Sequence, residues 1–544
     1  MSTFFIQQFG CRATQADGAA LERQLLDRGC TPASDPASAS IVVLNTCTVT
    51  AAADAQARDA IRKIHAQNPH ARLIVTGCYA QRAPEELASL PGVTYVVGNS
   101  HKPQIPDLIT QIVPAVLPRA TREQAADQNV IPSEARNPLF PLASPDVPFH
   151  SFVGAQHAVP APGKPSNLAD ASLRPAQILT GDIFAHPEFL SAPIQGGESH
   201  HTRPILKIQD GCNNRCSFCV IPYVRGKSRS LPPNEVIREI QKLTSPHPPA
   251  LGHTFLSVFS STSFTSCTSS TSSTSSISPA REIVLSGINL GTYGRDLTPR
   301  VELLALIRRI LDETQLDRLR ISSIEPQDVT QDLIDLFAST DRIAQHFHMP
   351  LQSASDRILA GMHRWYRSEH YARRVDLIHD RLPHAAIGAD LIAGFPGETE
   401  SDHAATVAFI EHRPFTYLHV FSYSPRPGTK AASMPNQVPA QIIKRRAREL
   451  RALSQSKSAA FRHSQQGRAL RVLTLHRDEH SISEHTGTEY TPALSSNYLR
   501  VQIPGIFAPN LWQDVFVTSE EGNYLLGEPA QTLCESSASS ASLR

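Results

Sequence analysis

The sequence has no long hydrophobic run and no excess of one charge. None of its apolar stretches reaches the roughly 18 residues of a membrane-spanning helix, so we expect no membrane segment. Its beginning, MSTFFIQQFGC, lacks the basic flank and apolar core of a signal peptide, which favours a cytoplasmic protein. The formal net charge of +1 neither favours nor excludes a polyanionic partner. A nucleic-acid site would therefore have to come from local clusters of basic residues.

Cysteine is too sparse for a disulfide scaffold. The chain has 9 cysteines in 544 residues, an odd number that falls into two main groups. This usage fits metal ligation in a reducing compartment better than disulfide pairing. The chain is also too long to fold around a single hydrophobic core, and ordinary domain sizes suggest about three or four domains.

Three cysteines have C-x3-C-x2-C spacing in DGCNNRCSFCVIPYVRG, residues 210–226. One loop can direct the thiolates of Cys212, Cys216 and Cys219 to three corners of a single cubane iron–sulfur cluster. The fourth iron would keep an open position, which can chelate S-adenosylmethionine and pass an electron to its sulfonium. Zinc sites favour paired ligands and close with four of them, and two-cluster ferredoxins use C-x2-C-x2-C runs. A zinc knuckle and half a ferredoxin site are therefore the weaker alternatives.

In residues 1–118, three extended apolar runs each lead into a cysteine, at Cys11, Cys47 and Cys78. Helical patterns follow the first two, which indicates a βα repeat and a parallel sheet. Since parallel strands end at one edge, the three thiolates could meet there and hold a second cluster. Each cysteine alone could equally be a small buried residue. Cys30 follows a helix end and is expected to be structural.

Helix and strand patterns alternate through residues 202–435. Six apolar strand patterns, separated by helical ones, predict a partial TIM-type barrel of parallel strands; they span 205–212, 281–291, 318–326, 346–353, 385–398 and 417–429. In such barrels function gathers at the carboxyl ends of the strands, where Gly287 and Gly291 would let the backbone approach a ligand closely. The overall prediction is an α/β chain of several domains.

Two interruptions and a C-terminal segment complete the chain. Residues 119–201 are rich in proline and alanine and predict an irregular insertion. Residues 245–280 form a Ser/Thr-rich insertion that includes Cys267, and residues 533–544, with Cys534, predict a disordered tail. Residues 436–532 predict a helix followed by a small antiparallel barrel. The helix carries a basic cluster, which is also typical of a solvated face: Lys444, Arg445, Arg446, Arg448 and Arg451.

These motifs resemble the successive motifs of the radical S-adenosylmethionine methylthiotransferase family. The central matches are DGCNNRCSFCVIPYVRGKSRS, IVLSGINLGTYG, RISSIEP, HMPLQSASDRILAGMHR, GADLIAGFPGETE and FSYSPRPGTKAA. NTCTVTAAAD and VTGCYAQRAPEEL resemble the N-terminal domain of that family, and the C-terminal segment resembles the RNA-binding TRAM domain. The first two central motifs look most like the branch that acts on N6-threonylcarbamoyladenosine beside the tRNA anticodon.

The resemblance implies an enzyme with two 4Fe–4S clusters. Cys212, Cys216 and Cys219 would hold the cluster that cleaves S-adenosylmethionine, and Cys11, Cys47 and Cys78 an auxiliary cluster that supplies or carries sulfur. Two molecules of S-adenosylmethionine would replace the hydrogen at purine C2 with a methylthio group. The implied partners are the anticodon stem-loop of tRNA, an electron donor such as flavodoxin or ferredoxin, and a sulfur donor. We expect a monomer.

Strand-end residues that match family motifs are candidates for binding the cofactor: Gly287, Asn289, Ser322, Glu325, Gln352, Asp390 and Gly394. Helix capping or loop support is an equal alternative for each of them. Arg225 and Lys227 could meet the cofactor carboxylate or an RNA phosphate. Thr14 stands where the family usually has asparagine, which puts the hydrogen bonding of the Cys11 loop in doubt.

The sequence is also compatible with other functions. The same chemistry could act on isopentenyladenosine in tRNA or on an aspartate of a ribosomal protein. An iron–sulfur protein that binds RNA or transfers electrons without catalysis is an alternative of another class.

Overall fold

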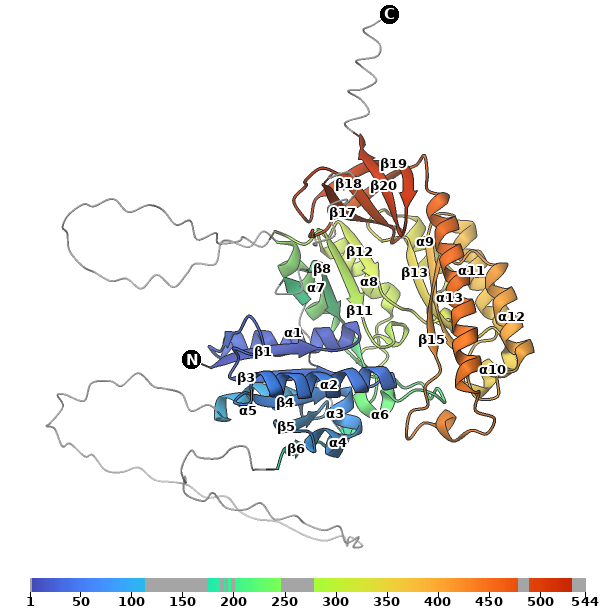
Figure 1. Ribbon diagram of the computed structural model, residues 1–544. Coiled ribbons are helices and arrows are strands. Elements are labelled where there is room, and N and C mark those ends of the chain that lie inside the picture. Colours follow the sequence, from blue (N-terminus) through green and yellow to red (C-terminus); the bar gives the residue numbers. More distant parts are fainter. Residues whose placement is uncertain are drawn as a thin grey trace, which may run out of the picture.

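A computed structural model describes residues 2–112, 175–185, 190, 194–196, 201–245, 278–477 and 489–530. Figure 1 shows three units: an N-terminal layered sheet, a central open barrel wrapped by helices, and a small C-terminal barrel. The predicted α/β fold with these three units is confirmed. Among the described residues, no helix combines the length and apolarity that a bilayer span requires.

The N-terminal unit is a parallel sheet of six strands in the order β2-β1-β3-β4-β5-β6. The strands are β1 (Thr3–Gln8), β2 (Thr31–Pro32), β3 (Ile41–Thr46), β4 (Arg72–Gly77), β5 (Val93–Gly98) and β6 (Gln177–Leu179). β3 is buried at every residue, as expected for a strand covered on both faces. One face packs on α1 (Arg12–Asp27) and α5 (Ile105–Ile112), and the other on α2 (Ala51–Gln67), α3 (Cys78–Arg82) and α4 (Pro84–Ala88).

Part of the region expected to be irregular is built into the sheets. β6 pairs with β5 at the edge of the N-terminal sheet, and β7 (Ile194–Gly196) pairs antiparallel with β8 (His201–Lys207). Each of the two added strands has three residues, too few to show a periodic pattern. Most of the 119–201 interruption, residues 246–277 of the Ser/Thr-rich one, with Cys267, and the 533–544 tail with Cys534 lie outside the described residues.

The central unit is the predicted open barrel of six parallel strands. One sheet has the order β12-β11-β8-β7 and the other β13-β14-β15, and parallel bridges from Leu319 to Ile343 and from Ser323 to His348 join them. The strands after β8 are β11 (Glu282–Ser286), β12 (Arg318–Ile321), β13 (His346–Gln352), β14 (Ala386–Ala393) and β15 (Tyr417–Ser422). A small pair, β9 (Gln209–Asp210) and β10 (Arg229–Ser230), flanks the cysteine loop.

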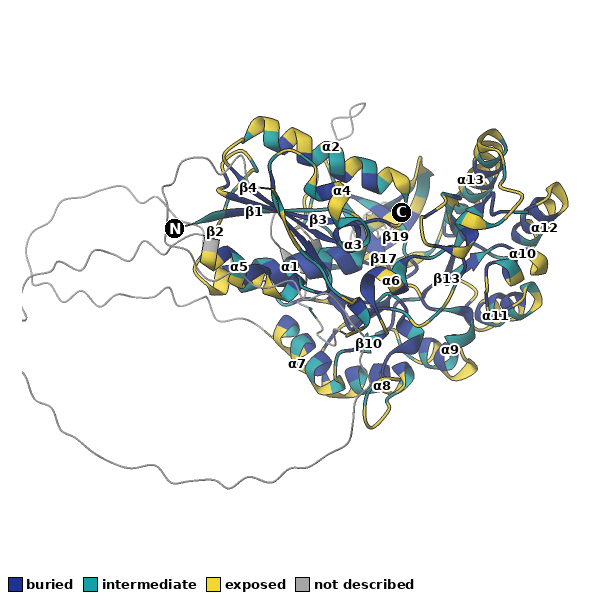
Figure 2. Ribbon diagram, turned by 90° about the horizontal axis from the view of Figure 1, so that it is seen from below, coloured by how far each residue is buried: buried dark blue, intermediate teal, exposed yellow. Residues whose placement is uncertain are grey.

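Helices cover the outside of this barrel and contribute apolar residues to one large core shared with its strands. They are α7 (Pro233–Thr244), α8 (Leu303–Glu313), α9 (Gln331–Ala338), α10 (Asp356–Gly361), α11 (Ser368–Arg381) and α12 (Glu400–Glu411). Figure 2 shows their buried residues facing inward and their exposed residues facing outward. The short helix α6 (Ile221–Arg225) follows the cysteine loop and lies beside α3 of the N-terminal unit.

The C-terminal unit begins with α13 (Ala440–His463), which packs along β15. The closed barrel that follows has the order β16-β17-β18-β20-β19; its strands are β16 (Ala469–Thr474), β17 (Tyr490–Ser495), β18 (Arg500–Pro504), β19 (Trp512–Glu521) and β20 (Tyr524–Pro529). Four neighbour pairs are antiparallel, but β18 and β20 are parallel. The predicted small antiparallel barrel is confirmed, and its one parallel pair arises because an odd number of strands cannot alternate direction around a closed ring.

Candidate functional site

The loop with Cys212, Cys216 and Cys219 folds back on itself between β9 and α6. The Cys212 amide donates to the Gly226 carbonyl at 3.1 Å, and the Cys219 amide donates to the Cys216 carbonyl at 3.1 Å. Two further amides point at sulfur, since the nitrogens of Asn214 and Ile221 lie 3.4 Å from the Sγ atoms of Cys212 and Cys219. Such donors stabilise thiolates, so the loop is arranged to present charged sulfur.

The three sulfurs of this loop lie close enough to repel one another as thiolates. Burial raises the pKa of Cys219 to about 12, and the sulfurs of Cys216 and Cys212 add to this rise. Burial also raises the pKa of Cys212. A metal centre would remove this cost by neutralising the thiolates. The donor set therefore fits a cluster held by three cysteines.

Arg364 contacts this cysteine loop from the end of α10, and we did not select it from the sequence. Its Nη1 lies 3.3 Å from Cys216 Sγ, and its Nη2 donates to Glu325. Burial raises the pKa of Glu325, although the Arg364 charge opposes the rise. Glu325 therefore holds Arg364 in place. Arg364 is the last residue of the motif HMPLQSASDRILAGMHR. Because this motif resembles a family motif, Arg364 could have been chosen as a candidate from the sequence.

Cys11, Cys47 and Cys78 come together at the carboxyl edge of the N-terminal sheet. Cys11 precedes α1, Cys78 begins α3, and Cys47 follows β3. Burial, together with the neighbouring Cys78 and Cys11 sulfurs, raises the pKa of Cys47 to about 12. Gly10, at φ 97°, allows this close approach, since a Cβ there would lie 2.4 Å from Cys47 Cβ. Helix N-termini favour thiolates, so this trio also fits a metal centre.

Thr14 keeps a polar contact with the Cys11 loop. Its hydroxyl lies 3.5 Å from Cys11 Sγ, and its carbonyl accepts a hydrogen bond from Asn45 Nδ2 at 2.7 Å. The side chain therefore still contacts the cysteine although it is not asparagine. Cys30 stands apart from the trio and packs, partly buried, against the apolar core beneath α1 and α5.

Both cysteine trios lie near α6. Asn99 Nδ2 is 3.5 Å from Cys78 Sγ and donates to the carbonyl of Val224, in α6, at 2.7 Å. Val224 follows Cys219 by a few residues. One side-chain amide therefore connects the N-terminal trio to the helix that follows the other trio.

Arg225 is buried between the units and does not present its terminal nitrogens to a ligand. Nη1 donates to both carboxylate oxygens of Asp210 at 2.9 and 3.0 Å, and Nη2 donates to Asp17 at 3.1 Å. Lys102 and Lys207 complete this network around Asp17. Burial opposes the ionisation of Asp17, but these three cations lower its pKa to about 2. The expected contact of Arg225 with a cofactor carboxylate or an RNA phosphate is thus replaced by a bridge between domains; Lys227 is exposed.

Three other candidates, Gly287, Asn289 and Ser322, follow the strands β11 and β12 at their carboxyl ends. The amide of Asn289 donates to Gln209 Oε1 at 2.7 Å, and its Nδ2 lies 3.9 Å from Cys212 Sγ. A Cβ on Gly287 would lie 3.0 Å from the same Gln209 Oε1. Asn289 Oδ1 and Ser322 Oγ are buried, and neither has a hydrogen-bond partner within the described part of the chain. Such unpartnered atoms indicate room for a polar ligand here.

Asp390 and Gln352 lie on the neighbouring strands β14 and β13. Asp390 Oδ1 accepts a hydrogen bond from His348 Nε2 at 3.0 Å, and His419 Nδ1 lies 3.4 Å from the same oxygen. Burial opposes its ionisation, but these two histidines hold the pKa of Asp390 below its usual range. Gln352 has a positive φ of 64° at the end of β13, a strained conformation that is concentrated at functional sites.

Gly394 serves packing instead of cofactor binding. Its φ is 83°, and a Cβ would lie 2.3 Å from Cγ1 of Ile443 on α13. Its amide donates to Glu398 Oε2 at 2.7 Å. The expectation that Gly394 contacts the cofactor is therefore not supported, because the space beside it is filled by α13.

Comparisons with known proteins agree with this geometry. Residues 3–98 match the family described as "Uncharacterized protein family UPF0004", and residues 206–410 match the radical SAM superfamily. The threonylcarbamoyladenosine tRNA methylthiotransferase MtaB of Aquifex aeolicus is 30% identical over 86% of this chain and 92% of its own. The Bacillus subtilis protein of that name is 30% identical over 93% and 91%.

The chain belongs to the radical SAM tRNA methylthiotransferases. It is thus a tRNA-modifying radical SAM enzyme, and this family implies S-adenosylmethionine and a 4Fe–4S cluster. Another relative is the tRNA-2-methylthio-N(6)-dimethylallyladenosine synthase of Syntrophobacter fumaroxidans, whose name states a different substrate. It is 27% identical over 97% of this chain and 96% of its own.

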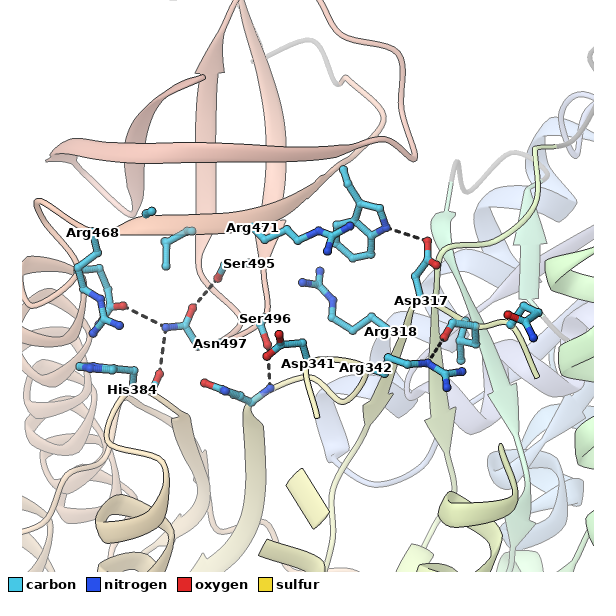
Figure 3. Close-up of a pocket in the computed structure, with 17 residues that line it drawn as sticks. Asp317, Arg318, Asp341, Arg342, His384, Arg468, Arg471, Ser495, Ser496 and Asn497 are labelled. Carbon is cyan, nitrogen blue, oxygen red and sulfur yellow. Dashed lines mark hydrogen bonds between the residues drawn. The ribbon is translucent and has the colours of Figure 1, made fainter. Parts of the chain in front are cut away.

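A groove in this methylthiotransferase lies between the central and C-terminal barrels (Figure 3). It has a volume of about 610 Å³ and is lined by Arg318, Arg342, Arg468 and Arg471, with Trp512 at one side. Arg342 donates to three backbone carbonyls, and Arg318 pairs with the buried Glu282 at 2.5 Å. Within the described residues, Arg468 and Arg471 have no ion pair. We call this the interdomain groove.

The interdomain groove lies at the other end of the barrel from the cysteines. Its lining includes Gln345, which precedes β13, and Arg318 at the start of β12. The cysteine loop contacts Asn289, which follows β11 at its carboxyl end. Figure 1 likewise shows the C-terminal barrel and α6 at opposite ends of the central barrel.

Proposed function

We propose that this enzyme methylthiolates N6-threonylcarbamoyladenosine next to the anticodon of tRNA, at purine C2. The observation that carries the proposal is the meeting of two cysteine trios beside one helix, α6. Each trio contains a thiol with a raised pKa, Cys47 in the N-terminal trio and Cys219 in the loop. Burial and the neighbouring sulfurs raise the pKa of each of these thiols to about 12. The choice of threonylcarbamoyladenosine rests on the two relatives of 30% identity, whose names state that substrate.

We assign Cys212, Cys216 and Cys219 to one 4Fe–4S cluster and Cys11, Cys47 and Cys78 to a second. When bound, the first supplies the electron that cleaves S-adenosylmethionine, and the second supplies or carries the sulfur. The protein's own contribution is orientation. Arg364 holds the Cys216 sulfur, and the free Asn289 Oδ1 and Ser322 Oγ provide acceptors for a polar cofactor.

The substrate and partners follow from this assignment. Arg468 and Arg471 of the interdomain groove offer two charges to the RNA backbone, and contacts of this kind position an RNA without reading its bases. A sulfur donor and an electron donor such as flavodoxin or ferredoxin complete the cycle. We expect the enzyme to act as a monomer in the cytoplasm. Dimethylallyladenosine, named for the 27% identical relative, is the second candidate substrate.

The test of this function starts with the metal content. Protein purified without oxygen should hold about eight iron atoms, as two 4Fe–4S clusters require. Cys47→Ala and Cys216→Ala should each lose about half of the iron. Cys216→Ala should also form no deoxyadenosine, whereas Cys30→Ala, a cysteine outside both trios, should match the wild type. Zinc, or only about four iron atoms, would refute the two-cluster assignment.

The substrate is then decided by product analysis. The enzyme is incubated with tRNA carrying either threonylcarbamoyladenosine or dimethylallyladenosine, and the digested nucleosides are measured by mass spectrometry. We expect a methylthio product from the first tRNA only. A product from the second tRNA alone would replace the proposed substrate.

A further inference from the structure

An exposed tryptophan lies next to the cysteine loop. The side chain of Trp365 is 74% exposed, whereas its neighbours Arg364 and Tyr366 are 7% and 3% exposed. Arg364 reaches Cys216 Sγ at 3.3 Å, so the exposed tryptophan directly follows, in the chain, the residue that contacts this sulfur. Large aromatic rings exposed in this way mark interaction sites when they belong to a patch.

Other exposed residues lie near Trp365 in the chain or beside the cysteine loop, and we call them together with Trp365 the loop-side patch: Arg215, Tyr223, His363 and Lys430. His363 Nδ1 lies 3.2 Å from the carbonyl of Arg215, the residue before Cys216, and His363 Nε2 lies 3.3 Å from Lys430 Nζ. The Arg215 guanidinium lies 6.0 Å from the ring centre of Tyr223, whose side chain is 53% exposed. Tyr223, Arg215, His363 and Lys430 are thus connected beside the cysteine loop, and Trp365 follows His363 by two residues.

The loop-side patch is positively charged, which favours an acidic partner. Within the described residues, neither Arg215 nor Lys430 has an ion pair, and the whole chain has a net charge of only +1. The two cations therefore attract an acidic surface locally. The cofactor acceptors Asn289 and Ser322 lie at the strand ends of the barrel, so the exposed outer side of the loop is left for another partner.

We propose that the loop-side patch docks the electron donor, an acidic protein that carries a one-electron flavin or iron–sulfur group. The proposal rests on the proposed function, because it assigns the donor to the cluster held by Cys212, Cys216 and Cys219. One electron leaves the reduced donor, which is oxidised by one electron, and enters that cluster. No bond or proton has to move. A small aromatic and charged surface suits a transient electron-transfer encounter.

Binding can be followed through Trp365 itself. The chain has two tryptophans, so Trp512→Phe leaves Trp365 as the sole one. Titrating this holoenzyme variant with a purified acidic flavodoxin should quench the emission of Trp365, and the quenching should weaken as salt is raised. Quenching by tRNA but not by flavodoxin would overturn the proposal and assign the patch to RNA.

Turnover provides a second readout. Deoxyadenosine formation is measured with reduced flavodoxin and with dithionite, and the first rate is divided by the second. Lys430→Glu and Trp365→Ala should lower this ratio roughly tenfold, with iron content confirming that each variant retains its clusters. Lys63→Glu, the same charge change on exposed α2, should leave the ratio unchanged.

The outcomes separate this proposal from the proposed function. Unchanged ratios and no quenching would overturn the docking site while methylthiolated tRNA is still formed. Failure of dithionite to produce any deoxyadenosine in the wild-type holoenzyme would overturn both.

Discussion

Arg364 has two partners that a lysine could not hold together. Its guanidinium reaches Cys216 Sγ with one terminal nitrogen and the Glu325 carboxylate with the other. The guanidinium also lies over the Tyr366 ring, 4.9 Å from the ring centre. The planar fork satisfies all three neighbours at once. We infer that Arg364 is a positioning residue for the cysteine loop.

Replacing Arg364 tests this role. Arg364→Lys keeps the charge but loses the fork, so we expect dithionite-driven deoxyadenosine formation to fall about 10- to 100-fold, as when outer-shell partners of metal ligands are changed. Iron per chain should stay at the wild-type value. Arg373→Lys, an exposed position on α11, is the matched control. A full rate in Arg364→Lys would show that the loop does not need this contact.

At the residue scale, the sequence predicts positions better than contacts. The cysteines could be found because strand ends and local spacing bring them together in a known way. Arg225 could not be interpreted correctly, because its partner Asp17 lies 208 residues away and only the packing of two domains brings them together. Arg364 was missed for a similar reason, since Cys216 is 148 residues distant.

The helix α13 shows how a basic run can hide a structural residue. Lys444, Arg445 and Arg448 are exposed, but Arg446 is buried and donates to Glu398 Oε2 at 2.8 Å. Burial raises the pKa of Glu398, although Arg446 opposes the rise. The charge on Glu398 therefore depends on Arg446, which holds α13 against the loop that follows β14.

We expect Arg446→Ala and Arg448→Ala to differ sharply in stability. Arg446→Ala leaves a buried carboxylate without its partner, which costs about 3–5 kcal/mol. Arg448→Ala should change the free energy of unfolding by less than about 0.5 kcal/mol, as exposed positions usually do. Thermal unfolding of both variants measures the difference. Equal midpoints would mean that Arg446 belongs to the solvated face of the helix.

Helices and strands could be predicted from the sequence where the hydrophobic pattern is long enough to show a clear period. The six barrel strands and the helices between them show clear periods, and the structure has them in the predicted order. β6 and β7 have three residues each, so their pairing depends on a neighbouring strand that is already formed. The parallel seam between β18 and β20 follows from closing an odd number of strands, which no local pattern reveals.

At the scale of the whole molecule, the cysteine trios and the interdomain groove lie far apart. The cysteine trios lie near the carboxyl ends of the barrel strands, and the interdomain groove lies at the other end. The C-terminal barrel is fixed there by buried contacts, since Arg320 donates to the carbonyls of Ser495 and Ser496 at 3.0 Å. A substrate that contacts both ends must be long, which suits the stem-loop of a tRNA better than a single nucleoside.

Removing Arg468 and Arg471 of the interdomain groove tests this arrangement. Arg468→Ala with Arg471→Ala should weaken tRNA binding for all tRNA sequences alike, because phosphate contacts carry no sequence information. The slope of log affinity against log salt should become shallower by about one unit for each arginine. Filter binding at several salt concentrations measures both effects. Arg62→Ala with Arg238→Ala, exposed arginines on α2 and α7, should keep the wild-type slope. If the groove variant also keeps it, the tRNA backbone lies elsewhere on the enzyme.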